Sequence, residues 1–554
     1  MEILDNCNLY STSRITMLVD KSLITISYNN ICMHDLLQEM GWEIIREQHR
    51  DDRGKWSRLW LFEDIHHVLT YNRVMCFGTH EVKGIMLNKS EQRLTHLDGK
   101  SFSNMRNLRL LKISNVDLSE DLQYLSDELR FLKWPEYPSS SLPLNFQPLN
   151  LFELNLCRSR IKYLWKGMKV FLKLKTIKLS YSHNLIETPD FKMVPNLENL
   201  DLEGCSRLRK VHETVGSLEG LTVLNLKGCK NLHSFPNKIS GLKSLKILNL
   251  QGCSKLDKLP QNLGELQCLE ELDASGTAIK QHFKALVYVH TNNHDTMLQQ
   301  QVNISSQFHI RLPGREIPKW FSYRGDGDSV GIGLPPNWLN DEFIGIAVCG
   351  VIALHPEDLN DISSVRCTMS IIKKDYSFYF FIPHFTTFES ELLWLAYASR
   401  EKFEQDLDYS SETSYELIRY LDYLQTGELD PSDEKEEYVS VSNSTCIHAE
   451  FGICTHVENL NSKVIKCGIR PVYKKDTECF QESPPAEGSI LHQNHICYTG
   501  YPWSIKSWRM PTKLEYYCNI RRDYGGIGLD TSFVRPEYSD SDEEEQLSTE
   551  RRRR

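Results

Sequence analysis

The sequence predicts an α/β leucine-rich-repeat solenoid, preceded by a winged-helix module and followed by a β-sandwich domain. The solenoid is predicted by the pattern L-x-x-L-x-L, which occurs eight times at spacings of 21 to 24 residues. The winged-helix module is predicted by a strand-like run and an amphipathic helical run near the N-terminus. The β-sandwich is predicted by short apolar and aromatic runs that alternate with Gly, Pro and Asn turns after residue 307.

The winged-helix module is assigned to residues 1–72. Residues 17–27 read as a strand pair, or as the end of a helix that runs into a strand. Residues 33–48 then place apolar side chains at helical spacing, and Asp35 stands near their start, where the helix dipole favours a negative charge. These apolar residues are Leu36, Leu37, Met40, Ile44 and Ile45. Residues 73–107 are predicted to form a bridge and an N-terminal cap for the repeats.

The repeats are assigned to residues 108–290, with a linker at residues 291–306. Their matches begin at Leu108, Leu129, Leu151, Leu174, Leu197, Leu221, Leu245 and Leu269. Each L-x-L is predicted to be a short strand whose leucines point inward, because one unit cannot bury its leucines unless its neighbours stack on it. Three repeats add a cysteine, at Cys205, Cys229 and Cys253, where a small buried thiol fits.

The residues between the leucines are predicted to point outward and to form the concave sheet of the solenoid. They mix both charge signs with polar side chains, and they contain no basic stripe and no catalytic constellation. We therefore predict a protein-binding face on this sheet. Its candidate residues are Thr176, Lys178, Ser180, Asn199, Asp201, Glu203, Asn225, Lys227, Asn249, Gln251, Glu271 and Asp273.

The β-sandwich is expected over residues 307–476. Residues 343–354 have the length and the β-branched content of a strand that is buried on both faces. Residues 404–438 are strongly acidic and are interpreted as an insertion on the solvated surface. Residues 477–554 are expected to be a variable, partly disordered tail.

Two Cys-x-His pairs lie within the expected β-sandwich, Cys446 with His448 and Cys454 with His456. Residues two apart on a strand share a face, so four zinc ligands are geometrically conceivable. The C-x-x-C pair that is common in structural zinc sites is absent. We therefore interpret the four residues as alternating strand residues and predict no metal.

The charge balance argues against nucleic acid as a partner. The chain has 64 Lys and Arg against 74 Asp and Glu, a formal net charge of −10, whereas nucleic-acid-binding proteins usually present a basic face. The longest apolar run, at residues 343–354, is shorter than the ~20 residues that a membrane helix needs. Because residues 1–30 lack the apolar core of a signal peptide, we expect a cytoplasmic chain with reduced thiols. The arginines at 551–554 add a weak match to a nuclear-import signal.

Several runs of the sequence resemble one protein family. Residues 18–48 (LVDKSLITISYNNICMHDLLQEMGWEIIREQ), 78–88 (GTHEVKGIMLN) and 312–321 (LPGREIPKWF) are similar to segments of plant intracellular nucleotide-binding leucine-rich-repeat disease resistance proteins. The resemblance is to the class with a Toll/interleukin-receptor-like front end. It implies that the predicted β-sandwich is the jelly-roll/Ig-like domain that follows the repeats in this class.

Met33, His34 and Asp35 match the Met-His-Asp motif of this class. The resemblance implies that His34 contacts bound ADP in an intact receptor. The sequence has no match to the phosphate-binding pattern G-x-x-x-x-G-K-[ST], and the signalling domain of the class has no counterpart in it. We therefore expect a nucleotide-binding remnant and no cofactor in this chain, although intact family members bind ADP or ATP.

The resemblance implies a fragment of an innate immune receptor that recognises a pathogen effector, or a guarded host protein, by protein binding. Defence signalling would then depend on upstream domains, and a full-length receptor is a further candidate partner. We expect no enzymatic activity and no binding to nucleic acid or membranes. Two alternatives remain open. The chain could be part of a full-length receptor that hydrolyses NAD through its front-end domain, or a repeat adaptor of the ubiquitin-ligase type.

Overall fold

The computed structural model describes most of the chain between residues 12 and 474. The main described ranges are 12–27, 30–50, 52–71, 79–87, 94–260, 268–279, 307–334, 340–358, 361–371, 374–380, 391–402, 445–455 and 460–474. The predicted linker at 291–306, the acidic insertion at 404–438 and the tail at 477–554 lie outside these ranges. The predictions for these three segments therefore stay predictions.

The N-terminal segment contains a helix and a small hairpin. Helix α2 (Thr12–Asp20) is followed along the chain by strands β1 (Thr25–Ser27) and β2 (Asn30–Cys32). The two strands pair in antiparallel register, with Thr25 opposite Cys32. The first of the two readings of residues 17–27, a strand pair, is therefore wrong for that range, because β2 begins only at Asn30. The second reading, a helix end that runs into a strand, is confirmed.

Helix α3 (Asp35–Gln48) coincides with the helical run predicted at residues 33–48. Its apolar stripe is not buried, and Leu36, Met40 and Ile44 are all exposed. Helix α4 (Phe62–Tyr71) differs in this respect, because its apolar side chains at helical spacing join the main core, through Ile65, Val68 and Leu69. None of the helices in the described ranges combines enough length with enough apolar character to span a membrane.

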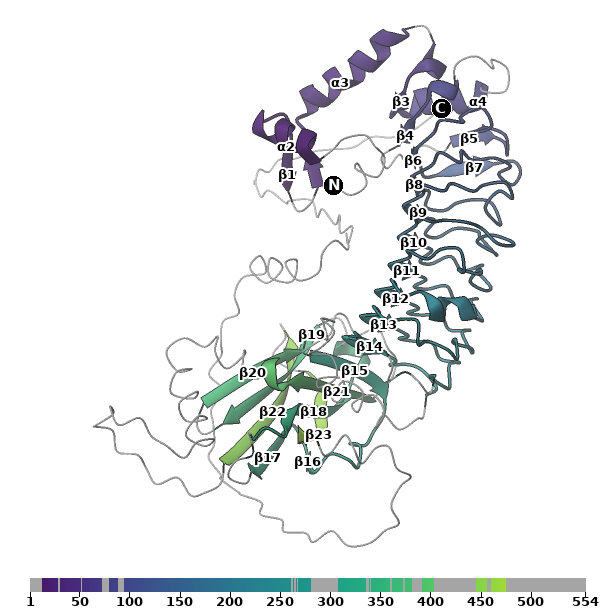
Figure 1. The fold of residues 1–554 in the computed structure, drawn as a ribbon. Coiled ribbons are helices and arrows are strands. Elements are labelled where there is room, and N and C mark those ends of the chain that lie inside the picture. Colours follow the sequence, from purple (N-terminus) through teal and green to yellow (C-terminus); the bar gives the residue numbers. More distant parts are fainter. Residues whose placement is uncertain are drawn as a thin grey trace, which may run out of the picture. The chain divides into compact units, whose positions relative to one another are not determined.

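The repeats form a ladder of short parallel strands, seen edge to edge in Figure 1. The strands are β3 (Arg58–Leu59), β4 (Gly84–Met86), β6 (Leu110–Lys112), β8 (Phe131–Lys133), β9 (Glu153–Asn155), β10 (Thr176–Lys178), β11 (Asn199–Asp201), β12 (Val223–Asn225), β13 (Ile247–Asn249) and β14 (Glu271–Asp273). A separate parallel pair is formed by β5 (Leu94–Leu97) and β7 (Val116–Leu118). The parallel ladder begins at β3, before the first leucine match at Leu108, because Ile85 of β4 occupies the same buried register as Leu111.

The predicted inward positions of the repeats are confirmed. Leu200, Leu224 and Leu248 are fully buried and face one another in register across β11, β12 and β13. The residues on either side of each leucine are half-buried, as expected for a strand with one face on the core. The local leucine pattern therefore determines which face of each strand enters the core.

The repeat cysteines are also buried, as predicted. The thiols of Cys205, Cys229 and Cys253 each donate a hydrogen bond, at 3.2 to 3.3 Å, to a leucine carbonyl of the preceding repeat. Burial raises the pKa of Cys205 and of Cys253 to about 12, so both thiols stay protonated. They act as small apolar groups that satisfy one backbone acceptor each.

Strand β15 (Gln307–Pro313) extends the sheet of the repeats into the segment that follows. It pairs in parallel with β14, with Ile310 beside Leu272, and in antiparallel with β21 (Glu391–Ser399). The sheet then continues through β18 (Phe343–Ala353), β23 (Lys463–Tyr473) and β16 (Tyr323–Asp326). The repeats and the post-repeat strands are thus joined by backbone hydrogen bonds.

A second sheet lies in the post-repeat region and shares a core with the first. It contains β17 (Ser329–Leu334), β22 (Thr445–Thr455), β19 (Ile362–Ile371) and β20 (Lys374–Phe380). Trp394 of the first sheet packs edge-on against Phe451 of the second, with ring centroids 6.0 Å apart. All residues of β18 except its last are buried, which confirms the predicted strand at residues 343–354.

Candidate functional site on the strand face of the repeats

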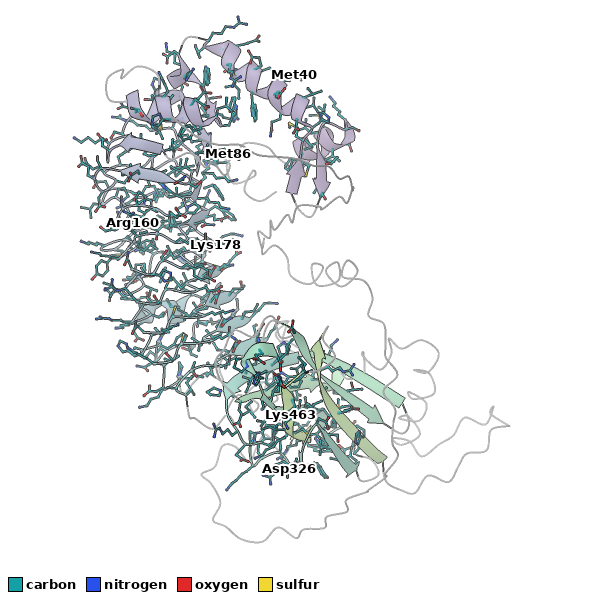
Figure 2. All side chains as sticks on the ribbon, turned by 180° about the vertical axis from the view of Figure 1, so that it is seen from behind. Met40, Met86, Arg160, Lys178, Asp326 and Lys463 are labelled. Atoms are coloured by element: carbon teal, nitrogen blue, oxygen red, sulfur yellow. The ribbon has the colours of Figure 1, made fainter. Side chains whose placement is uncertain are left out.

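The outward side chains of the parallel strands lie in columns, and we call this surface the strand face. One column contains Thr176, Asn199, Val223, Ile247 and Glu271, which are paired in register from β10 to β14. The next contains Lys178, Asp201, Asn225, Asn249 and Asp273. Neighbouring strands are about 4.8 Å apart, so side chains in a column touch. Figure 2 labels Met86 and Lys178 on the strand side of the repeats, and Arg160 away from it.

The exposure of the predicted binding residues divides them into two groups. Nine are half-buried, namely Thr176, Lys178, Asn199, Asp201, Glu203, Asn225, Lys227, Asn249 and Glu271. The other three are buried, with exposed fractions of 8% for Ser180, 5% for Gln251 and 2% for Asp273. The expectation that all twelve point into solvent is therefore wrong for these three. A role in partner binding stays a prediction for the rest.

Asp201 is the centre of one polar network on the strand face. Its Oδ2 accepts a hydrogen bond of 2.5 Å from the Ser180 hydroxyl, and its Oδ1 accepts one of 3.0 Å from the Asn225 amide. The backbone N–H of Glu203 also donates to Oδ1, at 3.1 Å. Burial raises the pKa of the Asp201 carboxyl, while the Ser180 hydroxyl partly offsets that rise. Ser180 is buried because its hydroxyl is committed to this carboxylate.

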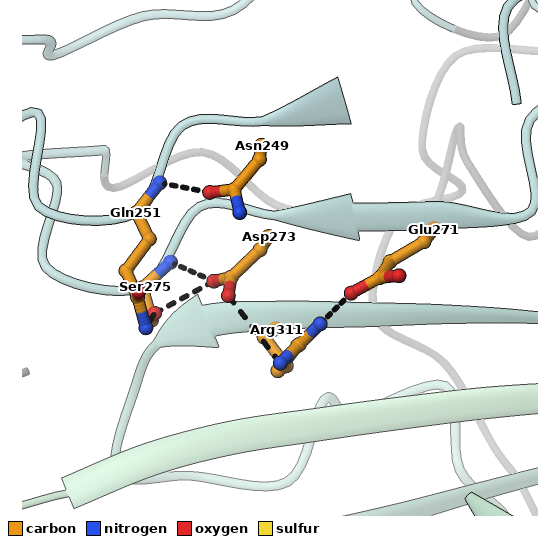
Figure 3. Close-up of polar contacts among 6 residues, drawn as sticks. All are labelled: Asn249, Gln251, Glu271, Asp273, Ser275 and Arg311. Atoms are coloured by element: carbon orange, nitrogen blue, oxygen red, sulfur yellow. Dashed lines mark hydrogen bonds and ion pairs between the residues drawn. The ribbon is translucent and has the colours of Figure 1, made fainter. Parts of the chain in front are cut away.

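A second network closes the last repeat, as Figure 3 shows. Arg311 of β15 forms ion pairs with Glu271 and Asp273 of β14, and its Nη1 lies 3.4 Å from the Asp273 Oδ2. The Asp273 Oδ1 accepts hydrogen bonds from the backbone and the hydroxyl of Ser275, at 3.0 and 2.6 Å. Burial lowers the pKa of Arg311 to about 10, which leaves the guanidinium charged at neutral pH. This network explains why Asp273 is buried.

Sequence reasoning missed Arg311 and three residues of the second column, Lys112, Lys133 and Asn155. Lys112 pairs in register with Lys133, Lys133 with Asn155, and Asn155 with Lys178, so the column runs back through β8 and β6. We call these four residues the lysine column. They could have been found by counting, because each lysine is the fourth residue after the first leucine of its match. Arg311 could not, because its partners lie in another strand and 40 residues separate it from Glu271.

A column of left-handed backbone conformations borders the strand face. Its non-glycine members, with φ between 58° and 61°, are Asn115, Glu136, Arg158 and Tyr181. Its glycine members, with φ between 68° and 72°, are Gly204, Gly228, Gly252 and Gly276. The same bond recurs along the column, since the N–H of Arg158 donates to Ser180 at 2.8 Å and that of Gly204 to Lys227 at 2.6 Å. This conformation costs an L-residue roughly 1–2 kcal/mol more than it costs glycine.

The Met-His-Asp motif lies at the start of α3. Met33, His34 and Asp35 are all exposed, and the Nδ1 of His34 accepts a hydrogen bond of 3.2 Å from the Leu36 N–H, which caps the helix. A pocket of about 480 Å³ lies farther along α3. Its charged lining residues are Glu39, Glu43 and Arg46, and His34 does not line it. One cation against two carboxylates does not fit a diphosphate. This pocket therefore does not suit ADP, and we derive no step through it.

The described ranges contain His, Cys, Asp and Glu side chains, which are the residue types that could ligate a metal. No cluster of three or more His, Cys, Asp and Glu that could hold a metal ion occurs there. His448 is exposed on β22 and lies opposite Gly331 of β17. Cys446, His448 and Cys454 lie on β22, which confirms their interpretation as strand residues, whereas His456 lies outside the described residues and its interpretation stays a prediction.

Family models match the two ends of the described chain. Residues 1–49 match the winged-helix domain of Roq1-like disease resistance proteins, and residues 312–478 match the C-JID domain. Among relatives, Disease resistance protein RPV1 of Vitis rotundifolia is 39% identical over 247 residues, which cover 40% of this chain and 17% of the relative. In these parts the chain is similar to plant disease resistance proteins. The predicted resemblance to the Toll/interleukin-receptor-like class is thereby confirmed.

Two further disease resistance proteins are similar to the chain. RUN1 of Vitis rotundifolia is 40% identical over 247 residues, covering 39% of this chain and 18% of the relative. RRS1 of Arabidopsis thaliana is 38% identical over 230 residues, which cover 38% of this chain and 18% of the relative. The matched residues thus cover less than a fifth of the full length of each of these three relatives. The predicted winged-helix module at its N-terminus is confirmed by the family model.

Two solved structures are similar to part of the chain. The leucine-rich repeat domain of the type III effector XCV3220 (XopL) is 22% identical, covers 33% of this chain and 63% of its own, and has a TM-score of 0.25. The functional domain of InlJ from Listeria monocytogenes is 16% identical and has a TM-score of 0.21. The match covers 36% of this chain and 50% of the InlJ chain.

Proposed function

We propose that the chain is a recognition segment that binds a pathogen effector, or a host protein that the receptor guards, through the strand face of its repeats. The observation that carries the proposal is the pair of in-register columns from β10 to β14. Apart from the buried Asp273, their side chains are half-buried, and they include charges of both signs along one sheet. Such a surface suits protein recognition, because polar and charged groups supply specificity while the buried leucines hold them in place. The relatives are named as disease resistance proteins, which supports this choice.

The post-repeat region is proposed to extend the same binding surface. Strand β15 joins the repeat ladder to the post-repeat strands, and Arg311 links it to β14 by buried ion pairs. A partner that spans the last repeats would therefore meet strands from both regions in one hydrogen-bonded sheet. We further propose that the two post-repeat sheets are a β-sandwich of the jelly-roll/Ig-like kind, which their shared core supports.

The proposed activity is binding without turnover, and no ADP is proposed for this chain. Signalling is assigned to other domains of a receptor, and a full-length receptor is proposed as a second partner. The cytoplasm, with access to the nucleus, is the proposed location. The ubiquitin-ligase adaptor is not favoured, because the relatives are disease resistance proteins. We propose no NAD hydrolysis by the residues of this chain.

The test is a binding screen of the purified chain against a panel of secreted pathogen proteins and their host targets, by biolayer interferometry. Thr176→Arg and Asn199→Arg place a bulky charge in the first column of the strand face. Asn237→Arg is the matched control, because Asn237 is exposed and lies outside the strands. A bound panel member should lose at least about tenfold in affinity with the first two variants and stay within about twofold with the control. Equal binding by all variants would remove the strand face from the proposal.

A further inference from the structure

We call the column of left-handed backbone conformations the left-handed column. Packing does not explain why residues other than glycine occupy part of it. In the four later repeats glycine occupies this position, and in the four earlier ones it is occupied by Asn115, Glu136, Arg158 and Tyr181. The conformation recurs with the repeat, and at six of the eight positions, from Glu136 to Gly252, the N–H donates to a carbonyl of the next repeat. Glycine would therefore be the less strained choice throughout. Glu136 and Arg158 are exposed, so burial of their side chains does not offset the strain.

These strained residues border a pocket of about 170 Å³. It is lined by Asn115, Glu136 and Arg158, together with Val116, Asp117, Pro138 and Arg160. Three of the four non-glycine members of the column thus converge on one hollow. Its volume is below the ~300 Å³ at which small-molecule pockets begin, and it suits a single amino-acid side chain. Strain that is retained at a concave site indicates a functional use of the side chains.

The lysine column precedes the left-handed residues in the same repeats. Lys112, Lys133 and Lys178 lie in register on β6, β8 and β10, three positions before the left-handed residues of their repeats. All three lysines are half-buried, and Arg158 and Arg160 of the pocket lining are exposed. The second column changes character at the next strand, where Asp201 takes the place of lysine. A local excess of cations therefore occupies the early repeats of a chain whose net charge is −10.

We propose that this surface, which we call the basic rim (Lys112, Lys133, Lys178, Asn115, Arg158 and Tyr181), binds an acidic polypeptide segment of the recognised protein. Carboxylates of the segment lie along the lysine column, and one side chain enters the pocket beside Arg158. Arg and Tyr are the residue types that most often anchor interfaces. This inference rests on the proposed function and names the chemistry of the partner.

A nucleic acid strand fits the basic rim less well than a peptide. Phosphates repeat along a strand without interruption, and proteins that track them present a continuous cationic path. The lysine column is broken by Asn155, and Glu136 and Asp117 lie in the pocket lining among the arginines. Separate carboxylates of a peptide can be placed at the cations and kept away from these acids. The observations therefore favour a polypeptide.

The first test uses the full chain and a fluorescein-labelled decaglutamate peptide in fluorescence anisotropy. The wild-type chain should bind it in a salt-dependent manner, and Lys133→Glu and Arg158→Glu should each weaken binding at least about tenfold. Lys227→Glu is the matched control, since Lys227 is half-buried on the same face in a later repeat. It should change binding by no more than about twofold. A failure of the wild-type chain to bind, or an equal loss with Lys227→Glu, would overturn the proposal.

A decalysine peptide and a ten-nucleotide oligo-dT are run beside it. Neither should bind with comparable affinity. Tighter binding of oligo-dT than of decaglutamate would overturn the peptide assignment in favour of nucleic acid. If a partner from the binding screen is weakened by Thr176→Arg and Asn199→Arg but not by Lys133→Glu or Arg158→Glu, this inference fails while the proposed function stands.

The second test separates binding from structure. Arg158→Gly removes the side chain and the backbone strain together, so the melting temperature should stay unchanged or rise while decaglutamate binding falls. Gly228→Ala calibrates the position, because it adds a side chain at φ 71° and should lower the melting temperature. If Arg158→Gly lowered the melting temperature as much as Gly228→Ala does, the side chain would be structural, and the proposal would be overturned.

Discussion

The Nη1 of Arg311 lies 3.4 Å from the Oδ2 of Asp273, and this ion pair joins the first strand after the repeats to the last strand within them. Both side chains are buried, and Glu271 holds the guanidinium from its other side. Buried charges are tolerated only where partners replace the lost water. The end of the repeat ladder is therefore closed by a charged group of the post-repeat region.

Removal of one partner should destabilise this junction. We expect Asp273→Ala to lower the free energy of local opening at β14 and β15 by about 3–5 kcal/mol, because it leaves part of a buried guanidinium uncompensated. Native-state hydrogen exchange of the β14 and β15 amides measures this. Lys246→Met is the control, since it breaks the solvent-exposed Lys246–Glu270 pair and should cost less than about 1 kcal/mol. Equal effects of the two substitutions would contradict the assignment.

The inward register of the repeats leads to a second prediction. Leu224 is fully buried in β12, and an unpaired carboxylate there should cost several kcal/mol, so Leu224→Asp should abolish the cooperative melting of the repeats. Val223→Asp is the control, because Val223 is adjacent in sequence but half-buried on the strand face. Circular dichroism during thermal denaturation distinguishes them. An unchanged melting curve for Leu224→Asp would mean that the register is wrong.

A third prediction concerns the loss of folding stability at acidic pH. Burial lowers the pKa of His309 in β15 from 6.5 to about 4, so the folded chain keeps this imidazole neutral where the unfolded chain takes up a proton. The neutral imidazole therefore contributes its full share to the free energy of unfolding above about pH 6.5. As the pH is lowered towards 4, the free energy of unfolding decreases by on the order of 2–3 kcal/mol, because the unfolded chain binds the proton first.

The measurement for this prediction is the melting temperature at pH 7.5 and pH 5.0. His309→Phe should show a smaller decrease between the two values than the wild-type chain does. His233→Phe, at an exposed histidine of the repeats, should keep the wild-type decrease. An unchanged decrease in His309→Phe would show that other groups carry the acid dependence of this region.

The fourth prediction concerns the thiols. Burial raises the pKa of Cys205 and Cys253 to about 12, whereas Cys32 is exposed. Alkylation requires an accessible thiolate, so iodoacetamide at pH 8 should modify Cys32 at least about a hundredfold faster than either repeat cysteine in the native chain. Mass spectrometry of tryptic peptides gives the rates. In urea the difference should vanish, and early labelling of Cys205 in the native chain would refute the buried assignment.

The leucine pattern was sufficient to predict the repeats, because each repeat presents the same side chains to its neighbours. The apolar, β-branched run at residues 343–354 was sufficient to predict a buried strand. Aligning the repeats also places Lys112 and Lys133 in the column of Lys178 without any coordinates. Helix α3 was predictable from its periodicity, but the exposure of Leu36 and Met40 was not. Periodicity identifies an apolar face and does not identify what covers it.

By itself, the sequence determined the solenoid, its inward register and the family, because stacking leucines and short motifs are local patterns that repeat or match in order. Only the tertiary structure decided that Asp273 is buried and that Arg158 adopts a left-handed backbone. Asp273 depends on a guanidinium from another strand, and Arg158 on a hydrogen bond to the next repeat. Both partners are distant in the chain, and their pairing is determined by the folded arrangement of the strands.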